Sequence, residues 1–275
     1  MKPAGFDYIR ADTVEEVLAA LSEHGAEARI LAGGQSLAAM LSMRLAKPAV
    51  VVDIMRLREL AAITSDKNSI VIPACVRQQA AFSWPNLQVT LPLLASALPW
   101  VGHLQTRSRG TICGSVAHAD PSAEIPLCLL ALEGEVRLRS RRRRRAVPAN
   151  SFFTGTMITD RADDEFIEAV AFPKRATGTG HAFAEVGRRH GDFAIVACAA
   201  VVDSKRIRLA VGGVADRPVA RDFPLLEGTA LDDALNTFAW DLGATDDLHA
   251  TSRYRRDLVR KLGRRTLEEA AACRG

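Results

Sequence analysis

Near the N-terminus, segments whose apolar residues recur with the spacing of a helix alternate with short segments that are typical of strands. Residues 13–16 are Thr-Val-Glu-Glu, a capping box that predicts the start of a helix. The apolar face of this helix would be formed by Val14, Val17, Leu18 and Leu21, and Gly25 is a typical stop. Residues 29–32 predict a short strand and the apolar run at residues 49–54 a second, buried strand, and a helix from Ser36 to about Leu45 is expected between them.

The middle of the chain predicts a second unit that begins near Leu57. A strand is expected at residues 69–72, followed by a helix from about 91 to 101 that Pro99 should end or kink. Residues 106–120 are polar and contain glycine, so we expect a long functional loop there. The segments that follow are predicted as an apolar helix at 122–132 and strands at 135–139 and 165–172.

The pattern changes after a predicted linker at residues 174–180. Strands are expected at 181–188, 194–202 and 207–214, with a hairpin turn at 203–205, and helices at about 230–238 and 252–272. Strands that are followed by helices indicate an α+β unit at the C-terminus.

The composition is typical of a soluble globular protein, with 275 residues of which 48% are hydrophobic and 25% charged. Residues 1–7 contain no apolar signal segment, and the longest apolar runs are too short to cross a bilayer. We therefore expect a cytoplasmic protein without a membrane span. The five cysteines form no C-x-x-C pair, which argues against a disulfide framework, a zinc site or an iron–sulfur cluster on this chain.

Much of the net charge of +4 comes from one block, formed by Arg137, Arg139 and Arg141 to Arg145. Such a block can bind nucleic acid, dock an acidic partner or form a solvated hairpin tip. No aromatic platform or helix-turn-helix pattern accompanies it, so we expect no nucleic-acid binding. We favour an exposed hairpin that lies apart from any cofactor and has no role in cofactor affinity.

Two short glycine-containing loops carry the most specific signal. Residues 30–37 are Ile-Leu-Ala-Gly-Gly-Gln-Ser-Leu, and residues 109–115 are Arg-Gly-Thr-Ile-Cys-Gly-Ser. Glycines allow backbone N–H groups to converge on an anion, and a helix that begins behind them adds its dipole. Two such loops in one unit indicate a large nucleotide cofactor whose diphosphate is held from both sides.

Five motifs in a fixed order include and follow these loops. They are Ala32–Leu37 with Met43–Leu45, Pro48 and Val52–Ile54; Thr111–Glu124; Phe152-Phe153-x-Gly155; Glu185–Ala194; and His249-Ala250-x-x-x-Tyr254-Arg255. Together they resemble the FAD-binding, or medium, subunits of molybdenum hydroxylases of the carbon-monoxide-dehydrogenase and xanthine-dehydrogenase type. The resemblance extends over essentially the whole chain.

The resemblance implies an α+β protein with two domains. Residues 1–176 would form an α/β FAD-binding domain of the PCMH type, with subdomains at about 1–56 and 57–176, and residues 177–275 an α+β domain with a small antiparallel sheet and helices. FAD would be bound noncovalently between the two subdomains. The implied cofactor-binding residues are Ala32, Gly33, Gly34, Gln35, Ser36, Leu37, Thr111, Ile112, Cys113, Gly114, Ser115, Glu124, Phe166 and Ala184.

The resemblance also implies an oxidoreductase subunit that passes electrons from a partner's iron–sulfur clusters to an external acceptor. The expected partners are a small subunit with [2Fe–2S] clusters and a large subunit with molybdopterin, in a dimer of heterotrimers. Glu124 would bind the ribose of FAD. No catalytic residue is expected on this chain, and His118 and Asp120 would fix the shape of the second loop by local hydrogen bonds.

The chain departs from the family's pattern at two positions. Cys113 stands where the family usually has glycine, and Ala184 where mammalian relatives carry a lysine near the flavin ring. A cysteine beside a flavin can form a thioether, but free cysteines usually behave as small apolar residues, so we expect noncovalent binding. Two other functions stay open: a self-sufficient FAD-dependent oxidase or dehydrogenase, and a basic interaction module without enzymatic activity.

Overall fold

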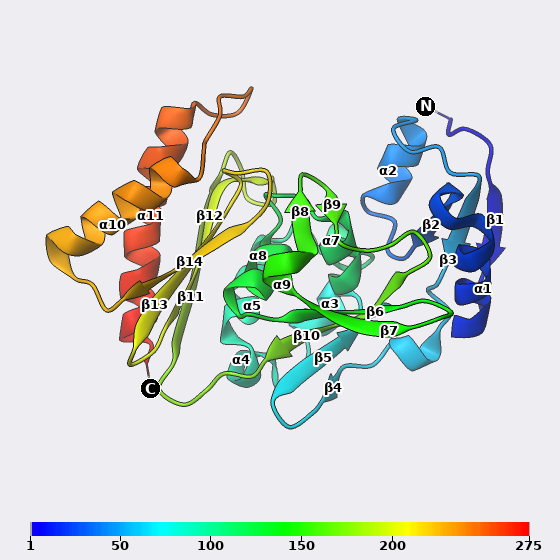
Figure 1. Cartoon of the computed structure of the whole chain (residues 1–275), viewed down its shortest axis with the longest axis horizontal. Helices are drawn as coiled ribbons and strands as arrows, with labels where there is room; N and C mark the ends of the chain where they lie inside the picture. The colour runs from blue at the N-terminus through cyan, green and yellow to red at the C-terminus, as the bar shows by residue number, and fades with distance from the viewer. Residues whose placement is uncertain (1, 275) are drawn as a thin grey trace.

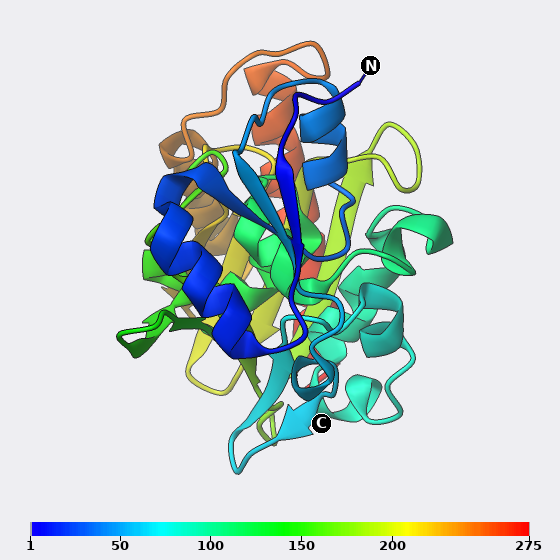
Figure 2. The ribbon, with the colours of Figure 1, turned by 90° about the vertical axis from the view of Figure 1, so that its right-hand side faces the viewer.

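The N-terminal unit is a three-stranded parallel sheet with one long helix on its face. The computed structural model describes residues 2–274, and its first sheet has the order β1 (Asp7–Arg10), β3 (Val50–Asp53), β2 (Ala28–Leu31). Helix α1 (Val14–His24) packs beside this sheet, and the short helix α2 (Leu37–Ser42) follows β2 (Figure 2). The Thr13 side chain accepts a hydrogen bond from the N–H of Glu16, so Thr13 caps the helix as the sequence predicts, while the Glu16 side chain accepts from the N–H of Asp12 at 2.8 Å.

The middle unit is a five-stranded antiparallel sheet covered by short helices. Its order is β4 (Thr64–Ser65), β5 (Ser69–Pro73), β10 (Phe166–Pro173), β6 (Glu135–Arg139), β7 (Arg144–Pro148). The helices are α3 (Gln78–Phe82), α4 (Leu87–Thr90), α5 (Pro92–Ala97), α6 (Leu104–Arg107), α7 (Ile112–His118), α8 (Glu124–Ala131) and α9 (Ala149–Phe152). A two-stranded ribbon, β8 (Phe153–Gly155) with β9 (Ile158–Thr159), follows α9.

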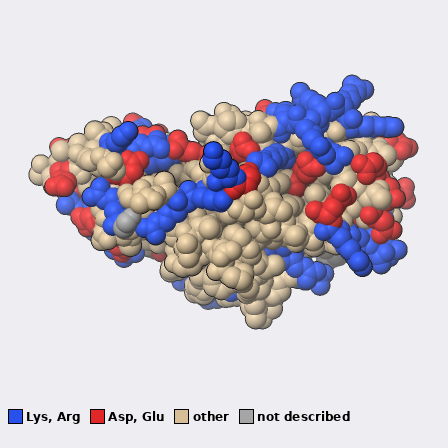
Figure 3. Space-filling view, turned by 90° about the horizontal axis from the view of Figure 1, so that it is seen from below, with Lys and Arg blue, Asp and Glu red and all other residues tan. Residues whose placement is uncertain are grey.

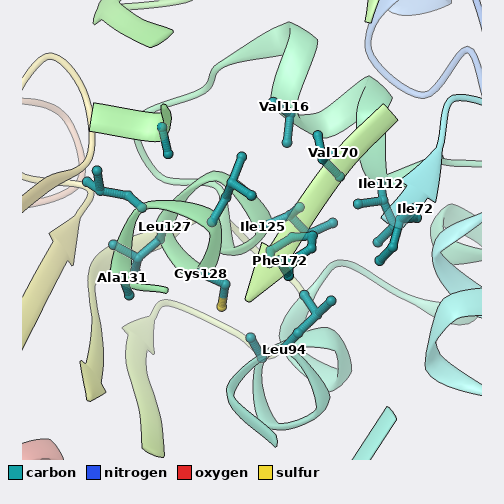
Figure 4. Packing of buried hydrophobic residues seen from close by; sticks show 14 of the residues in the cluster. Ile72, Leu94, Ile112, Val116, Ile125, Leu127, Cys128, Ala131, Val170 and Phe172 are labelled. Atoms are coloured by element: carbon teal, nitrogen blue, oxygen red, sulfur yellow. The ribbon is translucent and has the colours of Figure 1, made fainter. Parts of the chain in front are cut away.

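The core of the middle unit lies between its sheet and helices α5, α7 and α8. In Figure 4, Ile112 of α7 lies beside Ile72 of β5, and Ile125 of α8 beside Phe172 of β10. Every residue of α8 is buried, as expected for a helix that is apolar on all sides. This packing fixes the start of α7, where the second glycine loop ends.

The C-terminal unit is a four-stranded antiparallel sheet with two helices on one face (Figure 1). Strands β11 (Gly180–Gly187), β12 (Ala194–Val202), β13 (Arg206–Gly212) and β14 (Val219–Pro224) pair in chain order. Helices α10 (Gly228–Asp241) and α11 (Ser252–Ala272) form the outer layer and share a core with the sheet. None of the helices that the structure describes is both long enough and apolar enough to cross a membrane.

The predicted α+β class is confirmed, but several segments differ from the expectation, among them residues 106–120 and strand β14. Residues 106–120 are not one long loop, because they contain the end of α6 and the whole of α7. Helix α7 has only seven residues, too few for an apolar period to stand out, and it is held by the burial of Ile112 and Val116. Strand β14 was not predicted either, since its partly exposed sequence VARDFP has no regular alternation.

The arginine block lies on the predicted hairpin, at residues 137–145 of β6, its turn and β7. Most of its side chains are paired rather than free. Arg145 donates from Nε and Nη2 to the two carboxylate oxygens of Glu165 at 2.8 and 2.7 Å, and Arg143 donates to the same carboxylate at 3.2 Å. Glu165 is fully buried, so these contacts fasten the hairpin to the chain before β10. Acidic side chains are interleaved with the basic ones at this end of the molecule (Figure 3).

The first prediction concerns the buried Glu165. The hydrogen bond from Arg145 is the main cause that lowers the pKa of Glu165 to about 2. Its stabilisation is therefore present above the ordinary carboxyl pKa and is lost as the pH falls from about 4.5 toward 2. We expect Glu165→Gln to lower the unfolding free energy by about 3 kcal/mol near neutral pH. The variant should also lose less stability than the parent between about pH 5 and pH 3, as measured by urea unfolding.

Glu135→Gln is the matched control, because Glu135 also bonds an arginine of the block, Arg137, but is partly exposed. That substitution should change the unfolding free energy by less than about 1 kcal/mol. Equal losses in the two variants would contradict a special role for Glu165.

Candidate cofactor site

A cavity of about 700 Å³ lies where the three units meet. Its wall includes most of residues 28–37 from the first unit, many of residues 110–124 from the second, and the turn at 191–193 from the third. This volume falls within the range of roughly 300–1,000 Å³ that is typical of ligand sites. The cavity is therefore large enough for an extended ligand that contacts all three units.

The first glycine loop exposes a row of backbone donors to the cavity. It connects the end of β2 to the start of α2, and Gly34 has a φ of +72°, a conformation that favours glycine. The N–H groups of Gln35, Ser36 and Leu37 donate to no backbone acceptor in the described part of the chain. Neighbouring unpaired N–H groups at the start of a helix are a typical anion site.

The second glycine loop is fixed from behind by a segment that the sequence did not point to. The N–H of Gln78 donates to the carbonyl of Gly110 at 2.8 Å, and the N–H of Ile112 donates to the carbonyl of Val76 at 3.2 Å. Thr111 caps α7, since its Oγ1 accepts from the N–H of Gly114 at 3.0 Å. These bonds hold the loop against the middle sheet and leave its other side toward the cavity.

The two loops touch each other through their backbones. A Cβ placed on Gly33 would lie 2.2 Å from the carbonyl oxygen of Arg109 and 2.6 Å from the Cα of Gly110. Real Cβ atoms essentially never come this close to other atoms, so position 33 accepts only glycine without movement of the backbone. The glycines thus bring together two segments that are far apart in the sequence.

Twelve of the fourteen residues expected to bind the cofactor line this one cavity. They are Ala32, Gly33, Gly34, Gln35, Ser36, Leu37, Thr111, Cys113, Gly114, Ser115, Glu124 and Phe166. Ile112 and Ala184 do not line it. Ile112 points into the core of the middle unit, and Ala184 packs in the core shared by the C-terminal sheet and its helices. Side chains alternate along β11, so it is the neighbours Phe183 and Glu185 that face away from those helices.

Two buried carboxyl groups lie in and behind the wall. Burial is the main cause that raises the pKa of Glu124, in the first turn of α8, to about 7. Burial, followed by the charge of Glu124, raises the pKa of Glu185 on β11 to about 8. Burial therefore favours the neutral form of both carboxyl groups, and a carboxyl group can hydrogen-bond a hydroxyl in either protonation state. Asp120 accepts from the N–H of Ser122 at 2.8 Å, a local bond of the kind expected for it.

The surroundings of Cys113 disfavour the thiolate form of its side chain. Its side chain is buried and donates to the carbonyl of Ile72 at 3.3 Å. Burial is the main cause that raises the pKa of this thiol far above its ordinary value. A thiol without thiolate character is a poor nucleophile.

Several residues of the wall were not predicted from the sequence. They are Arg29, Gln78, Gly102, Thr106, Arg161 and Gly191–Phe193, among others. Gly191–Phe193 belongs to a motif that the sequence analysis noted, but its position beside the cavity depends on how β11 and β12 pack. The other residues belong to no motif, and only the folded chain brings them here.

Two family models match the chain. The model of the FAD binding domain in molybdopterin dehydrogenase matches residues 4–175, and the model of the CO dehydrogenase flavoprotein C-terminal domain matches residues 181–270. The 6-hydroxypseudooxynicotine dehydrogenase complex subunit alpha of Paenarthrobacter nicotinovorans is 35% identical, over 98% of this chain and 96% of its own. The nicotine 6-hydroxylase medium subunit of the same organism is also 35% identical, over 99% of both chains.

A solved structure also resembles this chain over its whole length. It is the carbon monoxide dehydrogenase of Hydrogenophaga pseudoflava that lacks the Mo-pyranopterin moiety of the molybdenum cofactor. The TM-score is 0.94 and the identity 32%, over 100% of both chains.

The second prediction concerns the contact between the loops. Gly33→Ala should lower the FAD content of the purified chain at least severalfold, because the added Cβ would push the carbonyl of Arg109 away and separate the loops. The flavin absorbance relative to protein absorbance measures the content. Gly5→Ala is the control, since a Cβ there has nothing within 4 Å and the backbone needs no positive φ. Full FAD content in Gly33→Ala would show that the contact between the loops does not support binding.

The third prediction concerns the linkage of the cofactor. Since the Cys113 thiol is buried and its pKa is raised, FAD should be bound noncovalently. Acid precipitation should therefore leave the flavin in the supernatant. Yellow colour that stays with the protein pellet, and disappears in Cys113→Ala, would instead establish a thioether.

Proposed function

Because this chain belongs to the family of FAD-binding medium subunits of molybdenum hydroxylases, we propose that it is the electron-transfer subunit of such an enzyme. It passes electrons from iron–sulfur clusters on a partner subunit to an external acceptor. The observation that carries this proposal is the joining of two donor-rich glycine loops at one cavity, with the C-terminal unit at its edge.

The residues present fit FAD. Unpaired N–H groups at Gln35, Ser36 and Leu37 suit a diphosphate, as does the Thr111–Ser115 segment on the neighbouring loop. Glu124 provides a carboxyl group for a ribose hydroxyl, and the apolar side chains of Ile30, Ile54 and Phe166 suit an aromatic ring. When it is bound, FAD supplies the redox chemistry, and the chain binds, orients and shields it.

The proposal includes the partners and the domain boundaries. The partners are a small subunit with [2Fe–2S] clusters and a large subunit with molybdopterin, in a dimer of heterotrimers. The names of the relatives, one a medium subunit and the other a subunit of a complex, support an assembly of this kind. The separate sheets and the two matched regions support a division into residues 1–176 and 177–275. Five free thiols, four of them buried, favour a reducing compartment such as the cytoplasm.

The fourth prediction tests this division of labour. The isolated, FAD-loaded chain should not oxidise N-heterocycles or aldehydes with an artificial dye as acceptor. After chemical reduction of its flavin, the same preparation should still reduce the dye. The measurements are the flavin absorbance and the dye colour, followed over time under anaerobic conditions.

The native complex is the positive control for substrate turnover. If substrate reduces the flavin of the isolated chain as fast as it does in the complex, the chain is a self-sufficient oxidase or dehydrogenase. A purified chain that never contains flavin would support the alternative of a basic interaction module.

A further inference from the structure

Two arginines line the cavity wall, the exposed Arg29 and the partly buried Arg161, and neither forms an ion pair among residues 2–274. Arg161 follows β9 and precedes β10, and its partly buried side chain lines the cavity. Its Nη1 donates at 2.7 Å to the backbone carbonyls of both Ala162 and Glu165. Its Nε and Nη2 meet no acceptor in the part of the chain that the structure describes.

The surroundings of Arg161 disfavour a charge that stays unpaired. Burial is the main cause that lowers its pKa, and the charge of Arg29, which lines the same wall, lowers it further. The carboxylates of Asp163, Glu165 and Asp164 act in the opposite direction and raise the pKa of Arg161, but among residues 2–274 none of them lies close enough to it to form an ion pair. A partly desolvated guanidinium remains charged, and its free energy falls when an anion binds to it.

The position of Arg161 is fixed by the arginine hairpin. Both carbonyls that hold Arg161 belong to residues 162–165, and the Glu165 carboxylate accepts from the N–H of Ala162 at 3.0 Å. The same carboxylate is bonded by Arg145 and Arg143 of the hairpin. The hairpin is therefore linked to the guanidinium in the wall through hydrogen bonds on both sides of the segment 162–165.

We propose that Arg161 binds the diphosphate of FAD and that Arg145, through Glu165, positions it for this contact. The inference rests on FAD binding by this chain, and the diphosphate is the anionic part of that cofactor. The glycine loops offer neutral N–H donors. Arg161 adds a full positive charge and a planar guanidinium, whose N–H groups can donate to two phosphate oxygens at once. In this arrangement the hairpin contributes to cofactor affinity, in contrast to the expectation from the sequence.

The fifth prediction uses ligands that differ in charge. Apoprotein of the full chain is titrated with FAD, ADP and adenosine, with protein fluorescence or calorimetry as the readout. Arg161→Met should raise the dissociation constants for FAD and ADP about tenfold, as expected for the loss of one hydrogen bond to a charged group. The constant for adenosine should change less than about twofold, because adenosine carries no phosphate. Arg161→Lys, which keeps the charge, should lie between the parent and Arg161→Met.

Two further readouts separate a charge contact from a structural role. The salt dependence of ADP binding should be weaker in Arg161→Met than in the parent, since an ionic contact has been removed. Arg175→Met is the matched control, because Arg175 also donates to two backbone carbonyls but lies outside the cavity wall. It should leave all three dissociation constants unchanged.

The positioning role is tested on the hairpin itself. Arg145→Met should weaken ADP binding severalfold and leave adenosine binding nearly unchanged, whereas Arg144→Met, at a more exposed neighbour, should affect neither. Equal losses for ADP and adenosine in Arg161→Met would overturn the proposal and indicate packing against the adenine instead. Unchanged ADP binding in that variant would overturn it as well. If the parent chain itself binds no FAD, it is the proposed function that fails.

Discussion

The close approach of Gly33 to Arg109 and Gly110 is the constraint on which the rest of the site depends. A backbone-to-backbone contact of this kind leaves no room for a side chain at position 33. It places the N–H groups at the start of α2 and the N-terminal end of α7 at the same cavity. Each loop alone would be an ordinary turn before a short helix. Their contact joins into one wall two loops that come from different structural units.

The surroundings of three buried glutamates shift the pKa values of their carboxyl groups in opposite directions. Glu165 is buried among arginine N–H groups, and its pKa is lowered to about 2, so it stays ionised and holds the hairpin. Glu124 and Glu185 are buried without such partners, and their pKa values are raised to about 7 and 8. The first arrangement gives a rigid ionic support behind the wall. The second favours the neutral form of both carboxyl groups in and behind the cavity wall.

The C-terminal unit contributes residues to the wall of the cavity. The turn between β11 and β12 brings Gly191–Phe193 to the cavity, and Glu185 of β11 interacts electrostatically with Glu124 of α8. The helices α10 and α11 pack on the opposite face of that sheet and share its core (Figure 1). One face of the C-terminal sheet is covered by α10 and α11, and the other face packs against the middle unit. The sheet can therefore form part of the cavity wall while its apolar residues stay buried.

The sequence by itself determined the features that depend on near neighbours in the chain. The capping box at Thr13 gave the start of α1, the helix over residues 252–272 was predicted with its observed bounds, and the glycine loops pointed to a phosphate site. Capping, helical period and glycine conformation are local, so these signals persist in the unfolded chain. The resemblance to the family identified twelve of the residues that line the cavity.

Only the tertiary structure decided which side chains face the cavity. Ile112 lies within a binding motif yet points into the core, because α7 must bury one side against β5 and β10. Ala184 faces the C-terminal helices because side chains alternate along β11. Arg161 belongs to no motif. It lies in the wall because it donates to the backbone carbonyl of Glu165, whose carboxylate is in turn bonded by Arg145 of the hairpin. Such contacts join residues that are distant along the chain, and no local pattern encodes them.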